Sequence, residues 1–370
     1  MEIYRYWLAL QHVAGVGNVL FKRLIEVYKA PEAVFEASDE SLSGIEGLSK
    51  NTAQAIHTFN AFDAVDRELE QIRQHQVSII TLNDPAYPER LADIYDPPPF
   101  LYMKGSLENT DDAPRSKDPQ YPIAVVGARK TTPYGRQVTE RLCRGLAEQG
   151  ATIVSGFARG IDALAHQSAL AAGGKTIAVL GCGIDVVYPP EHKKLYQHIS
   201  EQGAILSEFP MGTPPVSRNF PKRNRIISGL SLGCLVVEAG LKSGSLITAR
   251  LAMEQGREVF AVPGPIYSGM SAGPHQLIAS GAKLVQNASD ILGEILPQQP
   301  SRAAGVGMPK APPLAAEETD LFESLSFEPK HIDVLILESQ KPAAAVSGLL
   351  LTLELKGLAR QMAGQYYVRV

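Results

Sequence analysis

The stretch Ile123-Ala124-Val125-Val126-Gly127-Ala128-Arg129 opens the part of the chain whose pattern decides the fold. Four apolar residues followed by a glycine and a cation are typical of a buried strand that ends in a turn. Similar apolar runs recur at 152–154, 176–180, 204–206, 234–237 and 258–262, separated by helical stretches at 134–149, 162–172, 192–200, 246–255 and 274–280. Continuous apolar strands joined by helices predict a parallel sheet covered on both faces. We therefore expect an α/β fold with a doubly wound, Rossmann-like domain.

Glycine-containing turns follow several of these strands directly. They begin at Gly127, Ser155 and Gly181, and a fourth polar segment starts at Glu238 and runs on to Ser245. In doubly wound sheets, ligands bind beyond the carboxyl ends of the strands. Glycine lets a ligand approach the backbone closely, and helix N-termini present free N–H groups to anions. These turns therefore predict an anion-binding edge.

A basic stretch, Arg218-Asn219-Phe220-Pro221-Lys222-Arg223-Asn224-Arg225, lies between two of the strands, and no acid occurs between Glu208 and Glu238. Guanidinium groups bind phosphate oxygens bidentately, and an aromatic ring can stack on a base or a sugar. Pro221 disfavours a helical Phe220, which predicts a loop leading into a helix or a buried element. A charge run is usually a solvated surface. Because an apolar segment follows at once, we favour a fixed anion site.

Charge is distributed unevenly along the 370 residues. Residues 121–297 carry 17 Lys+Arg against 12 Asp+Glu, whereas residues 1–75 carry 7 against 11 and residues 318–370 carry 5 against 7. This distribution places anion binding in the middle of the chain. A GxxxxGK[ST] loop is absent, and Gly181-Cys182-Gly183 lacks the third glycine of a dinucleotide fingerprint, which disfavours ATP and NAD. We expect no cofactor, no metal and no catalytic group, with Asp162 capping a helix.

The flanking segments predict smaller domains. Residues 1–75 show two glycine turns followed by amphipathic helices, at Gly15-Val16-Gly17 and at Ile45-Glu46-Gly47, which is typical of sterile-alpha-motif or helix-hairpin-helix units. Such hairpins can contact DNA phosphate or protein, and the sequence leaves both open. Residues 76–297 form the extended Rossmann-like domain, 298–317 a linker. Residues 318–370, with helices followed by a hairpin around Ala363-Gly364, predict a winged helix.

Localisation follows from features that the sequence lacks. Its three cysteines (Cys143, Cys182 and Cys234) are widely spaced and form neither a CxxC pair nor a metal-ligand pattern. The N-terminus lacks the order of a signal peptide, and no apolar run has the length of a membrane span. We expect a cytoplasmic protein without membrane contact.

Several motifs together resemble the DNA-processing protein A family, also called Smf. They are Gly127-Ala128-Arg129, Ser155-Gly156-x-Ala158-Arg159-Gly160-Ile161-Asp162, Gly174-Lys175-Thr176-Ile177-Ala178-Val179, Tyr188-Pro189, Phe220-Pro221-x-Arg223-Asn224-Arg225-Ile226-Ile227 and Ser243-Gly244-Ser245-Leu246-Ile247-Thr248-Ala249. The resemblance covers roughly the whole chain. It implies a non-enzymatic, dimeric protein that binds and protects single-stranded DNA and loads the RecA recombinase during natural transformation, in competent cells. Single-strand-binding protein is a further possible partner.

The resemblance also implies which residues contact DNA. We expect phosphate contacts from Arg129, Arg159, Lys222, Arg223 and Arg225, stacking or loop packing by Phe220, and further contacts from Gly127, Ser155, Gly156, Gly160, Asp162, Asn224, Ser243, Gly244, Ser245 and Thr248. Pro190 stands where some members carry a DNA-contacting lysine, which Lys193 or Lys194 can replace. The alternative is a nucleotide-processing enzyme similar to the lysine-decarboxylase-like phosphoribohydrolases. Their PGGxGT-type loop is absent here, because Glu238 precedes Ala239-Gly240.

Overall fold

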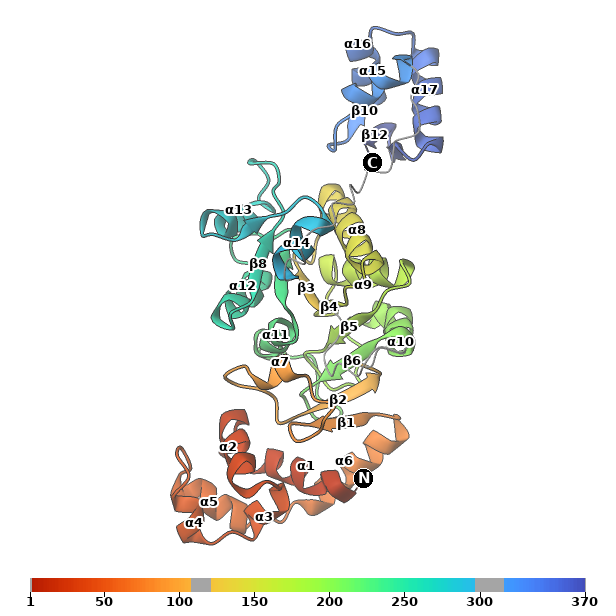
Figure 1. The fold of residues 1–370 in the computed structure, drawn as a ribbon. Helices are drawn as coiled ribbons and strands as arrows, with labels where there is room; N and C mark the ends of the chain where they lie inside the picture. The colour runs from red at the N-terminus through yellow and green to blue at the C-terminus, as the bar shows by residue number, and fades with distance from the viewer. Residues whose placement is uncertain (1, 108–120, 297–315, 370) are drawn as a thin grey trace. The chain divides into compact units, whose positions relative to one another are not determined.

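The computed structural model describes residues 2–107, 121–296 and 316–369. The chain divides into two compact units, residues 1–131 with 139–296 and residues 132–138 with 297–370. The first unit holds the helical N-terminal segment and a large sheet, and the second holds a small α/β module near the C-terminus (Figure 1). The α/β class and the three kinds of domain predicted from the sequence are all present, and the domain boundaries stay predictions.

The N-terminal segment is helical as far as residue 74. It consists of η1 (Glu2–Tyr4), α1 (Arg5–His12), α2 (Asn18–Tyr28), α3 (Pro31–Phe35), α4 (Asp39–Ser43), α5 (Lys50–His57) and α6 (Phe62–Gln74). Glycine turns join α1 to α2 and α4 to α5, as the repeat predicts. Serine hydroxyls at the N-caps accept a backbone N–H at the start of α4 and α5, from Ser41 and Thr52 respectively. Trp7 stacks on Phe21 with ring centroids 5.5 Å apart and fixes α1 against α2.

Nine of the described strands form one sheet, in the order β1-β2-β6-β5-β4-β3-β7-β8-β9. Their bounds are β1 (Ser78–Thr81), β2 (Phe100–Gly105), β3 (Ile123–Val126), β4 (Ile153–Ser155), β5 (Thr176–Val179), β6 (Ala204–Ser207), β7 (Gly233–Val236), β8 (Glu258–Ala261) and β9 (Lys283–Leu284). Strands β3 to β9 are parallel, whereas β1 and β2 are antiparallel additions beside β6. Chain order reverses between β3 and β7, so the sheet has a topological switch point there.

Helices cover both faces of the sheet. They are α7 (Glu89–Ala92), α8 (Pro133–Glu148), α9 (Ile161–Ala171), η2 (Pro190–His192), α10 (Lys193–Gln202), α11 (Asn219–Leu230), α12 (Gly244–Glu254), α13 (Ala272–Ala279) and α14 (Ala288–Ile295). Side chains of β5 alternate between two cores: Ile177 and Val179 pack in the same cluster as Ile226 of α11, while Ala178 packs in the same cluster as Leu195 of α10. Strand residues buried on both faces explain the continuous apolar runs.

Helix α11 corrects the prediction for the basic stretch. Residues 219–230 are helical, and Phe220 lies in the first turn rather than in an extended loop. Pro221 is tolerated because the first N–H groups of a helix have no intrahelical acceptor. Five of the predicted contact residues therefore lie on one helix, and its turn of about 100° per residue directs their side chains to different sides.

The first helical hairpin contacts the sheet domain. Asn18 donates to the Glu208 carboxylate at 3.4 Å, and Gln11 donates to the Glu208 carbonyl at 3.3 Å. A second contact is the buried Glu68 carboxylate of α6, which accepts from the Tyr102 hydroxyl at 2.7 Å and from the Met211 N–H at 3.0 Å. The structure thus shows that the N-terminal helices pack on the sheet domain, and contact with DNA phosphate or with protein stays open for the hairpin.

The second unit has the elements of a winged helix. They are α15 (Ala316–Ser324), β10 (Lys330–His331), α16 (Ile332–Ser339), α17 (Ala343–Leu355), β11 (Ala359–Met362) and β12 (Tyr366–Arg369). The predicted hairpin is confirmed, with Ala359 paired to Arg369 and Met362 to Tyr366. Most of the linker predicted at 298–317 lies outside the described residues. Within the described part of the chain, no single helix is long and apolar enough to cross a membrane, although the bent pair α16 and α17 meets the length and composition criteria.

Candidate nucleic-acid interface

A cleft of about 460 Å³ lies at the carboxyl end of the parallel strands, at the switch point between β3 and β7. Its walls come from the turn after β3, from the β4–α9 loop, from α11 and from the start of α12. The lining residues are Val126, Gly127, Arg129, Ala158, Asp162, Tyr188, Pro215, Ser217, Phe220, Pro221, Arg223, Asn224, Ile227, Ser243, Gly244, Ser245, Ile247 and Thr248. Ten of the sixteen predicted site residues therefore meet in one cleft.

Phe220 forms the aromatic wall of this cleft. The Arg129 guanidinium lies 5.6 Å from the centroid of the Phe220 ring, and the Tyr188 ring lies 6.0 Å from it. Arg129 is exposed and Phe220 is half-buried, so both can be reached from solvent. A cation held over an aromatic ring beside a second ring offers a nucleotide one phosphate contact and two stacking surfaces. Tyr188 was quoted only as part of the family motif and was not among the predicted contacts.

Arg223 lies beneath the cleft and holds its floor together. The residue is 4% exposed, and its guanidinium donates through Nη1 to the Gly156 carbonyl at 2.7 Å and, very closely, to the Val179 carbonyl. Burial lowers the pKa of this guanidinium to about 10, while Asp162 opposes that shift. The charge is thus used to join the ends of β4 and β5. This geometry favours a positioning role for Arg223 over the phosphate contact predicted from the sequence.

Asp162 and Ser155 also serve the loop between β4 and α9. The Ala158 N–H donates to Asp162 Oδ2 at 3.3 Å, so this carboxylate holds the preceding loop instead of capping α9, whose N-cap is Gly160. Burial raises the pKa of the Asp162 carboxyl, and Arg223 opposes that shift. Ser155 is fully buried and donates to the Val125 carbonyl at 2.6 Å. Because it has no exposed surface, Ser155 does not reach a ligand in this structure.

Arg225 is paired with carboxylates of the protein and is not available for the predicted phosphate contact. Its guanidinium is buried and pairs bidentately with Glu208, and Nε donates to Asp96 at 3.1 Å. Burial lowers the pKa of Arg225, but the two carboxylates outweigh it and leave the pKa above its ordinary value. A cation already satisfied by two carboxylates contributes structure, which corrects the prediction for this residue.

The glycines of the site differ in what they permit. A Cβ at Gly156 would lie 2.7 Å from both Arg223 and Asp162, and Gly160 combines a φ of +78° with a Cβ position 2.3 Å from the Ala128 carbonyl oxygen. These two glycines are required by the protein's own packing. A Cβ at Gly244, in contrast, would meet nothing within 4 Å. Gly244 starts α12 and lines the cleft together with Ser243 and Ser245, and the Ser243 hydroxyl accepts from the Ser245 N–H at 3.4 Å.

Exposed cations lie in and next to the segments that line the cleft. Arg129 lines the cleft itself, whereas Arg218 and Lys222 follow the lining residues Ser217 and Pro221 in the chain. All three are exposed, and among the described residues none of them has a carboxylate within ion-pair distance. Arg159 is exposed as well, but it is paired with Glu191. Arg218 belongs to the basic stretch and was not among the predicted contacts. Arg218 is the N-cap residue of α11, which the sequence pattern did not indicate because it predicted a loop at this position.

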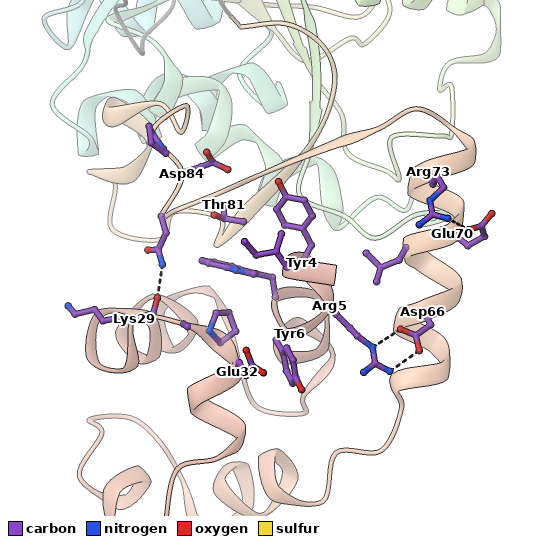
Figure 2. Close-up of a pocket in the computed structure, with 17 residues that line it drawn as sticks. Tyr4, Arg5, Tyr6, Lys29, Glu32, Asp66, Glu70, Arg73, Thr81 and Asp84 are labelled. Carbon is purple, nitrogen blue, oxygen red and sulfur yellow. Dashed lines mark hydrogen bonds and ion pairs between the residues drawn. The ribbon is translucent and has the colours of Figure 1, made fainter. Parts of the chain in front are cut away.

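A larger groove of about 1030 Å³ lies beside the N-terminal helices and β1 (Figure 2). Arg5 donates to Asp66 at 2.7 Å and 2.8 Å, and Arg73 lies 3.6 Å from Glu70. Its arginines are thus paired with acids of α6, and Glu32 and Asp84 add further negative charge. Size alone therefore does not make this groove an anion site, and the cleft at the strand ends remains the stronger candidate.

Comparison with known proteins identifies the family of each part of the chain. Residues 78–296 match the family model for DNA recombination-mediator protein A, residues 307–365 the DprA winged helix domain, and residues 8–58 a SAM-like helix-hairpin-helix tandem. The chain is 44% identical to the DNA processing protein DprA of Streptococcus pneumoniae, over 80% of this chain and 99% of that protein. It is 35% identical to Protein Smf of Synechocystis, over 98% of each.

Solved structures give the same result. The X-ray structure of DprA from Streptococcus pneumoniae superposes with a TM-score of 0.68 at 36% identity, covering 80% of this chain and all of that one. A structure of the Helicobacter pylori protein, described for its single-stranded DNA binding mode, superposes with a TM-score of 0.52 at 33% identity, covering 59% of this chain and 95% of that one. On the family model, the relatives and the fold together, this chain belongs to the DNA recombination-mediator protein A (DprA/Smf) family.

Proposed function

We propose that this protein binds single-stranded DNA in the cleft at the carboxyl end of its parallel sheet, without a cofactor. The observation that carries the proposal is an exposed cation held over an aromatic wall: Arg129 lies over Phe220 in the cleft, and two further exposed cations, Arg218 and Lys222, flank Phe220 in the chain. These cations can bind the phosphates of a DNA strand whatever its base sequence, and a flat aromatic ring can stack on any base. Binding of this kind is electrostatic and tolerant of sequence.

Shape supports a single strand over a duplex. Phe220 and Tyr188 stand in the wall of a recess, where their rings can meet a base only if that base is unstacked. A duplex keeps its bases paired and offers only its backbone to the exposed cations. We therefore expect the affinity for a single strand to exceed that for a duplex of the same length.

The remaining parts of the proposal come from the family to which the chain belongs. We propose that the protein protects single-stranded DNA, forms a homodimer and loads the RecA recombinase in natural transformation, with single-strand-binding protein as the species displaced. The cytoplasmic location predicted from the sequence stays part of this proposal. Because bound DNA occupies the cleft, we place the RecA contact on the outer helices of residues 192–297.

A gel-shift comparison of single- and double-stranded oligonucleotides at two salt concentrations tests the DNA-binding step. Strand-selective binding that weakens with salt is the expected result. Absence of DNA binding together with hydrolysis of a nucleoside monophosphate would instead support the phosphoribohydrolase-like alternative. Strand-exchange assays with single-strand-binding protein test loading, and light scattering with size exclusion tests the dimer.

A further inference from the structure

Glu191 lies directly against one of the cations of the proposed DNA site. Arg159 Nε donates to Glu191 Oε1 at 2.5 Å, with 57% of the arginine side chain and 49% of the glutamate side chain exposed. The hydrogen bond that Arg159 donates to Glu191 raises the pKa of Arg159 and lowers the pKa of Glu191. Both groups are therefore charged at neutral pH, and the pair is open to solvent and to ions.

The elements that carry the two residues hold them in place. Arg159 belongs to the loop between β4 and α9, and Glu191 is the middle residue of η2. His192, the next residue, packs edge-on against the Phe157 ring with centroids 5.3 Å apart. Two residues before Glu191, Pro189 is buried, whereas the adjacent Pro190 is exposed. Glu191 is thus anchored to the loop that carries Arg159 through His192.

Arg159 also lies beside the cleft. A small recess of about 30 Å³ is lined by Arg159, Gly156, Tyr188 and Phe220, and Arg129 contributes to both this recess and the cleft. A strand that stacks on Phe220 passes within reach of Arg159. Among the described residues, Arg129, Arg218 and Lys222 have no carboxylate at ion-pair distance, so the acid beside Arg159 sets this cation apart from the others.

We propose that Glu191 competes with DNA phosphate for Arg159. The proposal rests on the proposed single-stranded DNA binding. A carboxylate and a phosphate accept from the same guanidinium edge, so a phosphate that uses Arg159 Nε has to displace Glu191. The displaced carboxylate then repels the phosphate. An exposed ion pair is weak enough for a phosphate to displace the carboxylate. Glu191 therefore lowers the affinity for DNA phosphate at Arg159 without preventing the contact.

The lower affinity at Arg159 changes which ligands bind. A mononucleotide or a short oligonucleotide gains too few contacts to displace Glu191, whereas a longer strand engages Arg129, Arg218 and Lys222 at the same time. Glu191 therefore acts as a specificity-determining residue that favours polynucleotide strands over small phosphate-bearing molecules.

Fluorescence anisotropy with a labelled oligo-dT at several salt concentrations tests this. Glu191→Gln keeps the side-chain shape and removes the charge, and we expect binding at low salt to tighten about two- to fivefold, in line with an exposed ion pair. The slope of log K against log salt for a long strand should change by less than about 0.7, because such a strand already displaces Glu191 in the wild type and the number of phosphate contacts stays the same. A free nucleoside monophosphate should compete measurably better with the variant than with the wild type.

Two further variants separate the possible outcomes. The double variant with Arg159→Ala and Glu191→Gln should not show the tighter DNA binding of Glu191→Gln, because the arginine that the substitution frees is absent. Glu254→Gln, which removes an exposed acid paired with Arg250 on α12 outside the cleft lining, should leave affinity and slope unchanged. If Glu191→Gln weakens DNA binding as much as Arg159→Ala alone, Glu191 orients the arginine toward DNA. The proposal that Glu191 competes with phosphate is then wrong. Unchanged binding by Glu191→Gln also overturns it, whereas a wild type that binds no DNA overturns the proposed function first.

Discussion

Arg225 and Glu208 form a buried, bidentate ion pair, with Nη1–Oε1 at 2.8 Å and Nη2–Oε2 at 2.6 Å. Glu208 follows β6 and Arg225 lies on α11, so the pair joins a strand end to the helix that forms the cleft wall. Asn18 of the N-terminal domain donates to the same carboxylate. One cation of the most basic stretch of the sequence thus connects three parts of the fold: the end of β6, α11 and the N-terminal domain.

Removal of Arg225 should therefore destabilise the protein. Arg225→Ala leaves the Glu208 carboxylate buried without its partner, and we expect the free energy of unfolding to fall by about 3–5 kcal/mol. Urea unfolding followed by circular dichroism measures this. Arg218→Ala, an exposed cation from the same stretch, is the matched control and should change stability by less than about 0.5 kcal/mol. Equal stability of both variants would show that the pair is not needed for folding.

Arg129 should contribute to binding and not to stability. Arg129→Ala removes an exposed guanidinium, so affinity for single strands should fall for all sequences alike and the salt slope should decrease by about 0.7. Filter binding at four salt concentrations gives both quantities. Arg250→Ala, which removes an exposed cation of α12 outside the cleft lining, serves as the control. An unchanged slope in folded Arg129→Ala protein would argue against a phosphate contact there.

Phe220 should supply stacking energy. In Phe220→Leu, an apolar side chain still packs against Gly181 but the flat ring is lost, and base–aromatic stacking is worth about 1–3 kcal/mol per base. We expect weaker binding of oligo-dT and a much smaller effect on an abasic strand of the same length. Tyr95→Leu, at an aromatic that is 86% exposed and outside the cleft, is the control. The same loss on both strands would assign Phe220 to packing alone.

His166 should make stability depend on pH. Thr176 donates to the Ile153 carbonyl, so His166 donates to Thr176 through Nδ1, and Nε2 has no partner among the described residues. Burial lowers the pKa of His166 from 6.5 to about 3. Below pH 6.5 the unfolded chain binds a proton that the folded protein does not, so stability should fall with decreasing pH by up to about 1.4 kcal/mol per pH unit.

The slope between pH 6.5 and 4.5 tests this titration. His166→Asn keeps a donor for Thr176 but cannot titrate, so its unfolding free energy should vary less with pH than that of the wild type, whatever its absolute stability. His198→Asn, at an exposed residue of α10, should keep the wild-type slope. Parallel pH profiles for wild type and His166→Asn would assign the acid sensitivity to other groups.

The C-terminal unit should be dispensable for binding. Every residue that lines the cleft lies between Val126 and Thr248, and α17 of the winged helix contains no lysine or arginine. A chain that ends at residue 296 should fold and keep most of its single-strand affinity, with a salt slope within experimental error of the full chain. Loss of binding by a folded truncated chain would move the main site to the winged helix.

Local pattern in the sequence was enough to predict the sheet, the crossover helices and the two flanking domains. The run from Ile123 to Val126 is a strand at its predicted bounds, because residues buried on both faces must all be apolar. Glycine turns at the strand ends likewise predicted the edge at which the candidate cleft lies. These features depend on neighbours along the chain, and the sequence determines them by itself.

Tertiary structure alone decided which cations face solvent. Arg223, Arg225 and Lys222 lie within four residues of one another and are indistinguishable as charges, yet one lies beneath the cleft, one pairs with acids and one is exposed. Their partners come from elsewhere: Gly156, Glu208 and Asp96 are brought to α11 by the sheet and by the loop before β2. Because the energy of a buried charge depends on the acceptors around it, its role is settled only when the whole chain has folded.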